Sequence, residues 1–308
     1  MAAITVRGTS ALIPTAAADP LLTPFRLGHL MLRNRIMSTS HACGLEEDGM
    51  PKEAYQRYHE EKAKGGLALT MFGGSSNVAI DSPSVFRQLN LGTDAVVPWL
   101  EQFSGRIHAR GAAIMCQLTH LGRRGEPYAG AWLPAVAPSP LRETMHRAIP
   151  REMDEHDIAR IIAAYAAAAR RCLTGGLDGV ETLTGGHLPG QFLSPLTNRR
   201  TDRFGGSLEN RMRFVLMLYE AIRKATHDRP FLVGIRWVID EGLDGGLDTD
   251  EALAVAERLK AEGLVDFFNA IFGAMDTHRA LAEDNMPGMG QPLAPWVARV
   301  GAFRRAIG

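Results

Sequence analysis

The chain has 308 residues, 45% of them hydrophobic, and its 34 basic and 34 acidic residues give a formal net charge of zero. A chain of this length and apolar content can bury a large core, and it fits one large α/β domain better than several small ones. Balanced charge creates no long-range field that would attract nucleic acid or an anionic membrane surface, so neither is expected as a partner.

The three cysteines, Cys43, Cys116 and Cys172, are too few and too widely spaced for a disulfide framework or a structural zinc site. We therefore expect no metal site, and we expect a reducing, cytoplasmic location. Residues 1–20 are interrupted by Arg7 and Pro14 and lack the apolar core of a secretory signal, so we expect a loose leader before a domain at 21–308. No apolar run is long enough to span a membrane.

Short apolar segments alternate with segments of helical periodicity along the whole chain. The predicted strands are 35–39, 67–72, 113–118, 177–183, 231–237 and 265–271. Asp154, with Asp157 three residues later, predicts the start of one intervening helix, and Asp248 predicts the start of another. A last helix is expected at 296–307.

This alternation predicts parallel strands joined by crossover helices, because parallel neighbours cannot be joined by tight hairpins. Polar residues and glycines follow the strands at their carboxyl ends: Ser40, His41, Gly73, Gln117, His120, Thr184–His187 and Arg236. In a (β/α)8 TIM barrel that end is the catalytic face. A Rossmann sheet would need a G-x-G-x-x-G turn after its first strand, and none is present there.

Only about six βα units can be counted, two fewer than a closed barrel contains. A barrel without its last two strands has two open edges, which expose apolar surface and unpaired backbone. The sequence is thus consistent with a fragment of a longer gene product, one half of a split enzyme, or a barrel completed by another chain.

A long polar loop, 186–214, follows the fourth predicted strand and leads into a helix. This loop, together with LRNRI at 32–36, QLTHLGR at 117–123 and VGIR at 233–236, resembles the Old Yellow Enzyme family of flavin oxidoreductases. That group includes dienoyl-CoA reductases and demethylases related to trimethylamine and dimethylglycine dehydrogenases. The motifs occur in the family's order over residues 20–308.

The resemblance implies a bound FMN. A flavin ring needs hydrogen-bond donors along its edge and positive charge near N1 and O2, which Gln117 and Arg236 can supply. The family uses main-chain groups at positions matching Ser38, Thr39 and Ser40, and a close approach at Gly73. The alternatives are a polar cap at a strand end for Gln117 and a salt bridge to a carboxylate for Arg236.

Two histidines are the candidate catalytic residues. His187 is the candidate proton donor, because its position in the loop matches an acid residue of relatives and an ordinary histidine pKa near 6.5 suits proton transfer at neutral pH. The alternative is a loop histidine hydrogen-bonded to a carbonyl group. His120 either lines the site or supports it structurally.

One departure from the family bears on the reaction. Typical ene-reductases carry H-x-x-H or H-x-x-N after the fourth strand to hold the substrate carbonyl, whereas 181–187 reads ETLTGGH and is one residue shorter. A demethylase or amine-oxidising relative is therefore favoured. The aromatic rings of Tyr128, Trp132 and Trp237 could face a methylated cation, or they could be packing residues.

The sequence therefore predicts an FMN-dependent oxidoreductase that transfers a hydride between flavin and a small organic substrate. NAD(P)H would recharge the flavin of a reductase, whereas a demethylase would pass its electrons onward; a 4Fe-4S cluster is expected only in a longer parent chain. The alternative is a non-catalytic or split-enzyme fragment that binds FMN only with a partner. A homo-oligomer or a complementing C-terminal chain would be that partner.

Overall fold

The computed structural model describes residues 19–308, except 83, 84, 86, 126–132, 146, 148, 276, 286 and 287. The expected leader, residues 1–20, lies outside the described residues apart from its last two. The candidate aromatic residues Tyr128 and Trp132 also lie outside them.

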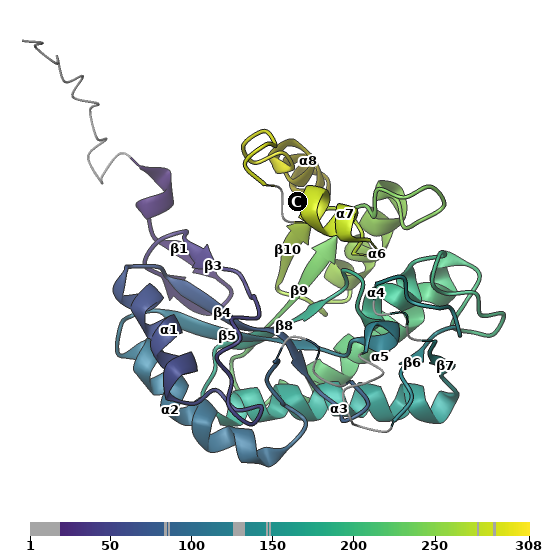
Figure 1. Cartoon of the computed structure of the whole chain (residues 1–308). Helices are drawn as coiled ribbons and strands as arrows, with labels where there is room; N and C mark the ends of the chain where they lie inside the picture. The colour runs from purple at the N-terminus through teal and green to yellow at the C-terminus, as the bar shows by residue number, and fades with distance from the viewer. Residues whose placement is uncertain are drawn as a thin grey trace, which may run out of the picture.

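Six parallel strands form one curled sheet, in the order β10-β9-β8-β5-β4-β3 (Figure 1). Their bounds are β3 (Met37–Ser38), β4 (Leu69–Asn77), β5 (Ala113–Thr119), β8 (Gly179–Leu183), β9 (Leu232–Val238) and β10 (Phe267–Ile271). All six coincide with predicted strands, although β3 is shorter than expected. The prediction of a parallel barrel-type α/β fold with about six βα units is confirmed.

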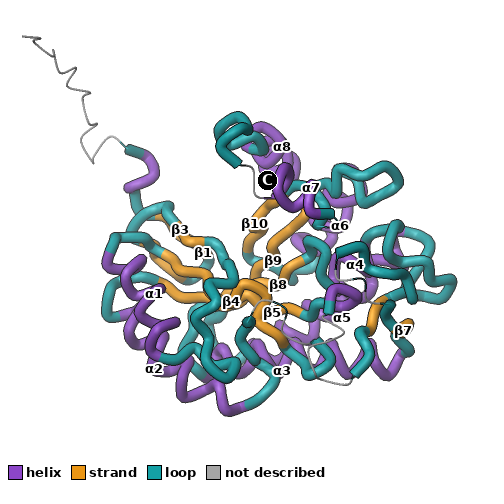
Figure 2. Tube along the Cα trace, viewed as in Figure 1, coloured by secondary structure: helices purple, strands orange, loops and turns teal. Residues whose placement is uncertain are grey.

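Helices lie between successive strands on the outside of the curl, and the last helices follow the final strand (Figure 2). The longer ones are α1 (Glu53–Lys64), α2 (Val97–His108), α3 (Glu155–Thr174), α5 (Leu208–Thr226), α6 (Thr249–Ala261) and α8 (Val297–Ile307), with short α4 (Leu188–Leu193) and α7 (His278–Ala280). The predicted helix starts are confirmed, because Asp154 and Asp248 each accept a backbone hydrogen bond as N-caps of α3 and α6. At α3 the Asp157 side chain accepts a hydrogen bond from the backbone N–H of Asp154, which completes a capping box.

Smaller elements complete the described chain. An antiparallel hairpin, β1 (Phe25–Leu27) with β2 (Leu30–Leu32), precedes the sheet, and β6 (Val136–Ala137) pairs in parallel with β7 (Arg151–Glu152). The remaining turns of helix are η1 (Pro20–Leu22), η2 (Asp94–Val96), η3 (Gly122–Arg124) and η4 (Leu281–Asn285). No helix among the described residues is long and apolar enough to cross a membrane.

Apolar side chains form two clusters, one on each face of the sheet. The larger one lies between the sheet and the helices and includes the predicted buried stripe of α3, with Ile158, Ile161 and Tyr165. The smaller one lies inside the curl, where Met71 and Met115 pack near Leu32 of the hairpin. The polar side chains of the inner face lie further along the strands, towards their carboxyl ends.

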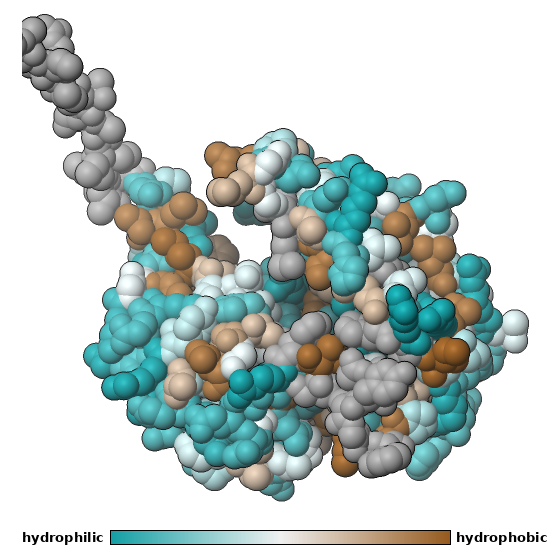
Figure 3. All heavy atoms as spheres, in the orientation of Figure 1, coloured by the Kyte–Doolittle hydropathy of each residue, from teal (hydrophilic) through white to brown (hydrophobic). Residues whose placement is uncertain are grey.

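The curled sheet has two open edges, because β3 and β10 each pair with one strand only among the described residues. A groove of about 360 Å³ is lined by Met37 of β3, Phe267 and Phe268 of β10, and Leu27 of the hairpin. In Figure 3 the surface is hollowed between the N-terminal hairpin region and the α8 region. The structure is thus a half-barrel with apolar surface at its opening.

Candidate active site

Four polar side chains form one layer inside the curl: strand register sets them in two pairs, and a hydrogen bond from Asn269 to Glu181 joins the pairs. Gln117 of β5 lies beside Glu181 of β8, and Arg236 of β9 lies beside Asn269 of β10. Alternate residues of a strand face the same side of a sheet, so these positions share the inner face. Because parallel strands end at the same edge, the layer lies at the carboxyl ends, where the sequence predicts the site.

Glu181 is at the centre of this layer and is fully buried. Its Oε1 accepts hydrogen bonds from Gln117 Nε2 at 2.7 Å and from Ser40 Oγ at 3.3 Å, and its Oε2 accepts one from Asn269 Nδ2 at 3.1 Å. Burial raises the pKa of Glu181, while the positive charge of Arg236 and the three donors oppose that rise. The carboxylate is thus held by neutral donors from three different parts of the chain.

The Arg236 guanidinium donates hydrogen bonds through Nη1 and has an unused donor at Nε. Its Nη1 donates to the carbonyl oxygen of Ser40 at 3.2 Å and to Ser40 Oγ at 3.4 Å. Its Nε is buried and has no hydrogen-bond partner among the described residues. A buried N–H group without a partner costs free energy, so this atom suits an acceptor supplied by a ligand.

Gln117 and His187 are linked through Ser75. The backbone N–H of Ser75 donates to Gln117 Oε1 at 3.0 Å, and Ser75 Oγ lies 2.9 Å from His187 Nε2. Ser75 has a φ of 73°, a left-handed conformation that is uncommon for residues other than glycine. This backbone conformation accompanies the two bonds that connect the glutamine to the histidine.

The imidazole of His187 is neutral in this environment. The side chain is 3% exposed, and burial together with the nearby guanidinium of Arg124 lowers its pKa to about 3. Its Nδ1 lies 2.5 Å from the carbonyl oxygen of Gly185, which can only accept a hydrogen bond, so Nδ1 carries the proton. His187 Nε2 therefore accepts a bond from the hydroxyl of Ser75.

His120 is fully buried beside the site, with both ring nitrogens engaged. Its Nδ1 accepts from the backbone N–H of Gly122 at 3.0 Å, and its Nε2 lies 3.2 Å from Asp81 Oδ1. Asp81 also pairs with Arg160, and although burial raises its pKa, the bonds from His120 and Arg160 lower it overall. These contacts suit a supporting role, and a catalytic role for His120 stays a prediction.

The other predicted cofactor residues are not all in the layer. Ser40 lies within it, whereas Ser38 Oγ accepts a bond from Lys62 of α1 at 3.1 Å and Thr39 is exposed. Gly73 was expected at the end of the second strand, but β4 continues to Asn77 after a register shift. A Cβ at Gly73 would lie 2.9 Å from the carbonyl oxygen of Gln117, so the missing side chain permits close backbone packing.

Of the two interpretations of Trp237, the structure supports packing and not contact with a substrate. Trp237 is fully buried in the outer cluster, where its ring packs edge-on against Phe268. It follows Arg236 by one residue, and successive side chains of a strand point to opposite faces. Trp237 therefore faces the helices and not the interior of the curl.

Two residues of the layer and the linking residue Ser75 are absent from the sequence-based assignment. Glu181 and Asn269 are the polar members of otherwise apolar sets of alternate residues in 177–183 and 265–271, and that interruption is the signal that could have identified them. Nothing in the sequence distinguishes Ser75, whose φ and contacts appear only in the fold.

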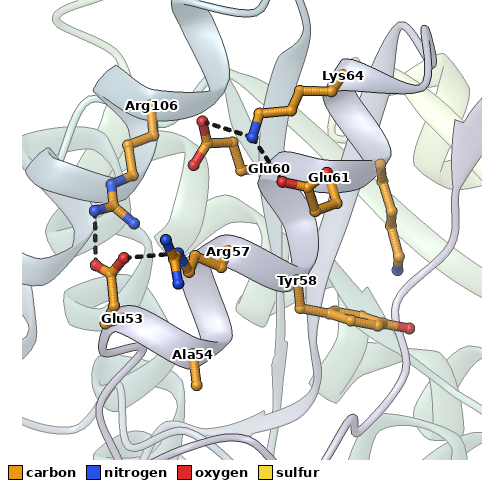
Figure 4. A pocket seen from close by; sticks show the side chains of 9 residues that line it. Glu53, Ala54, Arg57, Tyr58, Glu60, Glu61, Lys64 and Arg106 are labelled. Carbon is orange, nitrogen blue, oxygen red and sulfur yellow. Dashed lines mark hydrogen bonds and ion pairs between the residues drawn. The ribbon is translucent and has the colours of Figure 1, made fainter.

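A surface hollow of about 860 Å³ lies elsewhere, along α1 (Figure 4). Its charged side chains pair with one another, as Glu53 does with Arg57 and Arg106, and Lys64 does with Glu61. It contains none of the predicted site residues and carries no functional assignment. Cys43, Cys116 and Cys172 are free thiols, and the described residues contain no cluster of three metal-ligating side chains.

Residues 20–279 match the model of the NADH:flavin oxidoreductase / NADH oxidase family. The chain belongs to this family. It is 57% identical over 293 residues to a multifunctional alkene reductase/demethylase OYE of Caballeronia cordobensis, which covers 95% of this chain and 43% of that protein. It is 48% identical over 288 residues to a probable N-methylproline demethylase of Rhizobium meliloti (strain 1021), with 94% and 42% covered.

Solved structures agree with this membership. A 2-naphthoyl-CoA reductase complex superposes with a TM-score of 0.83 at 25% identity, covering 93% of this chain and 45% of that one. Morphinone reductase superposes with a TM-score of 0.73 at 29% identity, covering 82% and 73%. The chain spans less than half the length of the two curated relatives named above.

Proposed function

We propose that this chain provides the flavin-binding layer of an FMN-dependent oxidoreductase, which passes a hydride between the flavin and a small organic substrate. The observation that carries the proposal is the convergence of Gln117, Ser40 and Arg236 in one inward layer, where Arg236 Nε is buried and has no partner in the described part of the chain. The donors fit the electron-rich edge of a flavin, where positive charge stabilises the reduced state. Membership of a flavin-dependent family supports the same conclusion.

Two side chains of the layer would hold the cofactor. Gln117 keeps one amide proton beyond the one it donates to Glu181, and Arg236 keeps its Nε proton. When bound, FMN would supply the atom that accepts or gives the hydride. NAD(P)H would recharge it in a reductase, while a demethylase would pass its electrons onward.

His187 is proposed to handle a proton at Nε2. With a pKa of about 3 the imidazole is neutral and weakly basic at neutral pH, and its Nε2 accepts from Ser75, so proton transfer there requires a bound substrate that displaces the hydroxyl and raises this pKa. Oxidation of a protonated amine requires a base, whereas reduction of an activated alkene requires an acid. The relatives favour an N-methylated amine or amino acid as substrate, because both curated relatives above carry the word demethylase in their names.

The cofactor proposal is tested by titrating the purified chain with FMN and following flavin fluorescence. We expect wild type to bind, Arg236→Ala to bind at least about tenfold more weakly, and Arg236→Lys to recover part of the loss, because a charged donor contributes about 1.5–3 kcal/mol. Equal binding by all three proteins would contradict the role of Arg236.

The reaction is tested by anaerobic mixing of FMN-loaded protein with N-methylated amino acids. Bleaching of the oxidised flavin band is expected with such a substrate, and His187→Ala should slow it while leaving FMN affinity unchanged. Reoxidation of the reduced protein by an activated alkene alone would favour the reductase instead. Undiminished rates in His187→Ala would remove the proton-transfer role.

A second candidate function is a fragment that binds FMN only together with a partner chain. The open edges β3 and β10, and the apolar groove between them, favour it, because such surfaces are costly when exposed to water. The partner would be a complementing chain that supplies two further βα units, or a second copy. Colourless protein that binds FMN only after such a chain is added would support this candidate over the first.

A further inference from the structure

We propose that Glu181 is a positioning residue: its carboxylate fixes the direction in which the Gln117 amide faces, and its charge offsets that of Arg236 where the cofactor would bind. The second half of this inference rests on the proposed FMN site. The first half concerns the protein alone.

The contacts of Glu181 differ from those of a buried carboxylate in an ion pair. Its hydrogen-bond donors Gln117, Ser40 and Asn269 are all neutral. The Arg236 guanidinium acts on it electrostatically and donates its hydrogen bonds to Ser40. Burying a carboxylate without a directly paired cation is costly. An uncharged side chain of the same shape would fill the volume at lower cost, so the fold gains little from a charge at this position.

The carboxylate and Ser75 together allow one orientation of the Gln117 amide. The backbone N–H of Ser75 requires an acceptor, which is Gln117 Oε1, and Glu181 requires a donor, which is Gln117 Nε2. Rotation of the amide by 180° would place its NH₂ group against the N–H of Ser75 and its oxygen against the carboxylate. The amide is therefore held with one proton left to donate.

The same bonds connect the two residues assigned to chemistry. From Glu181 the hydrogen bonds pass through Gln117 and Ser75 to His187 Nε2. A change at Glu181 should thus alter the Gln117 amide directly and leave the outward-facing residues of β8 undisturbed.

The charge of Glu181 has a predictable effect on a bound flavin. A reduced flavin carries more negative charge than an oxidised one, so a nearby carboxylate opposes reduction and Arg236 favours it. Replacement of Glu181 by glutamine removes the opposing charge. The midpoint potential of the bound flavin should then become more positive.

The test compares Glu181→Gln with Thr182→Val. Thr182 is the next residue of β8 and is also fully buried, but its hydroxyl bonds to Tyr219 on the outer face. Thr182→Val therefore reproduces loss of a buried polar contact in the same strand without touching the layer. The readouts are the Gln117 side-chain amide resonances of the FMN-free protein, the FMN dissociation constant and the flavin midpoint potential.

We expect Glu181→Gln to shift the Gln117 amide resonances, to weaken FMN binding by about tenfold and to make the potential more positive, whereas Thr182→Val changes none of these. Unshifted resonances together with an unchanged potential would overturn the proposal. If wild type binds no FMN, the proposed function fails, and the Gln117 resonances alone still decide whether Glu181 orients the amide.

If Glu181→Gln does not fold, Asn269→Ala provides the second variant. Asn269 is half-buried on the edge strand β10, and its removal takes one donor from Glu181 while the carboxylate stays. The less neutralised charge should move the potential in the negative direction, opposite to the effect of Glu181→Gln. No change in potential would contradict the charge-balancing role.

Discussion

At the scale of single residues, the environment decides which of a side chain's chemical states is present. His187 has the residue type expected of a proton donor, yet burial and the Arg124 charge keep it neutral. His120 has both nitrogens occupied by Asp81 and a backbone N–H. Residue type thus indicates where chemistry can occur, and the contacts determine its direction.

The buried neutral state of His187 makes stability depend on pH. Below pH 6.5 the unfolded chain binds a proton at this residue and the folded chain does not, so stability falls as pH decreases towards the folded pKa of about 3. Between pH 7.0 and 5.5, the free energy of unfolding should fall by roughly 1 kcal/mol less in His187→Gln than in wild type, because the variant lacks this group. The uptake of one proton changes that free energy by at most about 1.4 kcal/mol per pH unit. Urea unfolding at the two pH values measures the difference.

A control is built into this comparison. The pKa of His59 is also lowered by burial, and His59 is present in both proteins, so its contribution cancels. Parallel loss of stability by the variant and wild type would show that His187 is not the group responsible.

At the scale of elements, local sequence signals specify the helices well and the irregular strand β4 poorly. The cap at Asp154 is encoded within four residues, and α3 begins where the sequence predicts. The turn at Gly73 and Gly74 depends instead on chain segments distant in sequence, because a Cβ at Gly74 would lie 2.0 Å from the carbonyl carbon of His41. Such a requirement cannot be read from neighbouring residues.

The N-cap of α3 gives a prediction about stability. Asp154→Ala should lower the free energy of unfolding by about 1 kcal/mol, because the backbone N–H of Asp157 loses its acceptor. Asp154→Asn keeps an acceptor at that position and should cost less. Chemical denaturation of the three proteins checks the order, and equal losses in both variants would argue against the cap.

The tight packing at Gly74 gives a second prediction about stability. Gly74→Ala should destabilise the fold by about 2 kcal/mol or more, since it combines a positive φ of 47° with a backbone collision. Gly263→Ala is the matched control, because its φ is 65° and nothing lies within 4 Å of the added Cβ. Similar thermal shifts for both variants would mean that backbone strain alone, and not the contact with residue 41, sets the cost.

At the scale of the whole molecule, the open half-barrel determines where the structure is weakest. The central strands β5 and β8 have neighbours on both sides, whereas β3 and β10 form the edges beside the apolar groove. Edge strands have fewer protecting bonds and open more readily. The weakest part of the sheet is thus the part that a complementing chain would cover.

Hydrogen exchange should reflect this arrangement. Amides of β10 are expected to exchange at least tenfold faster than those of β5 and β8, because opening an edge costs less free energy than opening the centre. Exchange followed by mass spectrometry measures the order, and an added complementing chain should slow β10 selectively. Uniform protection across the sheet would contradict the open edge.

The sequence by itself determined the number, order and parallel direction of the main strands, the starts of α3 and α6, and the placement of Gln117 and Arg236 at strand ends. These features are encoded in patterns of a few residues: periodicity, caps and short motifs. The motifs also sufficed to identify the family that the comparisons show.

Only the tertiary structure decided which side chains meet and in what state. Arg236 and Ser40 are 196 positions apart, and Ser75 and His187 are 112 apart, yet each pair is in hydrogen-bond contact. The hydrogen bonds that meet at Glu181, the neutral state of His187 and the outward direction of Trp237 all follow from burial and register. Both depend on how distant segments pack, because the electrostatic cost of a charge is set by its whole surroundings and not by its neighbours in sequence.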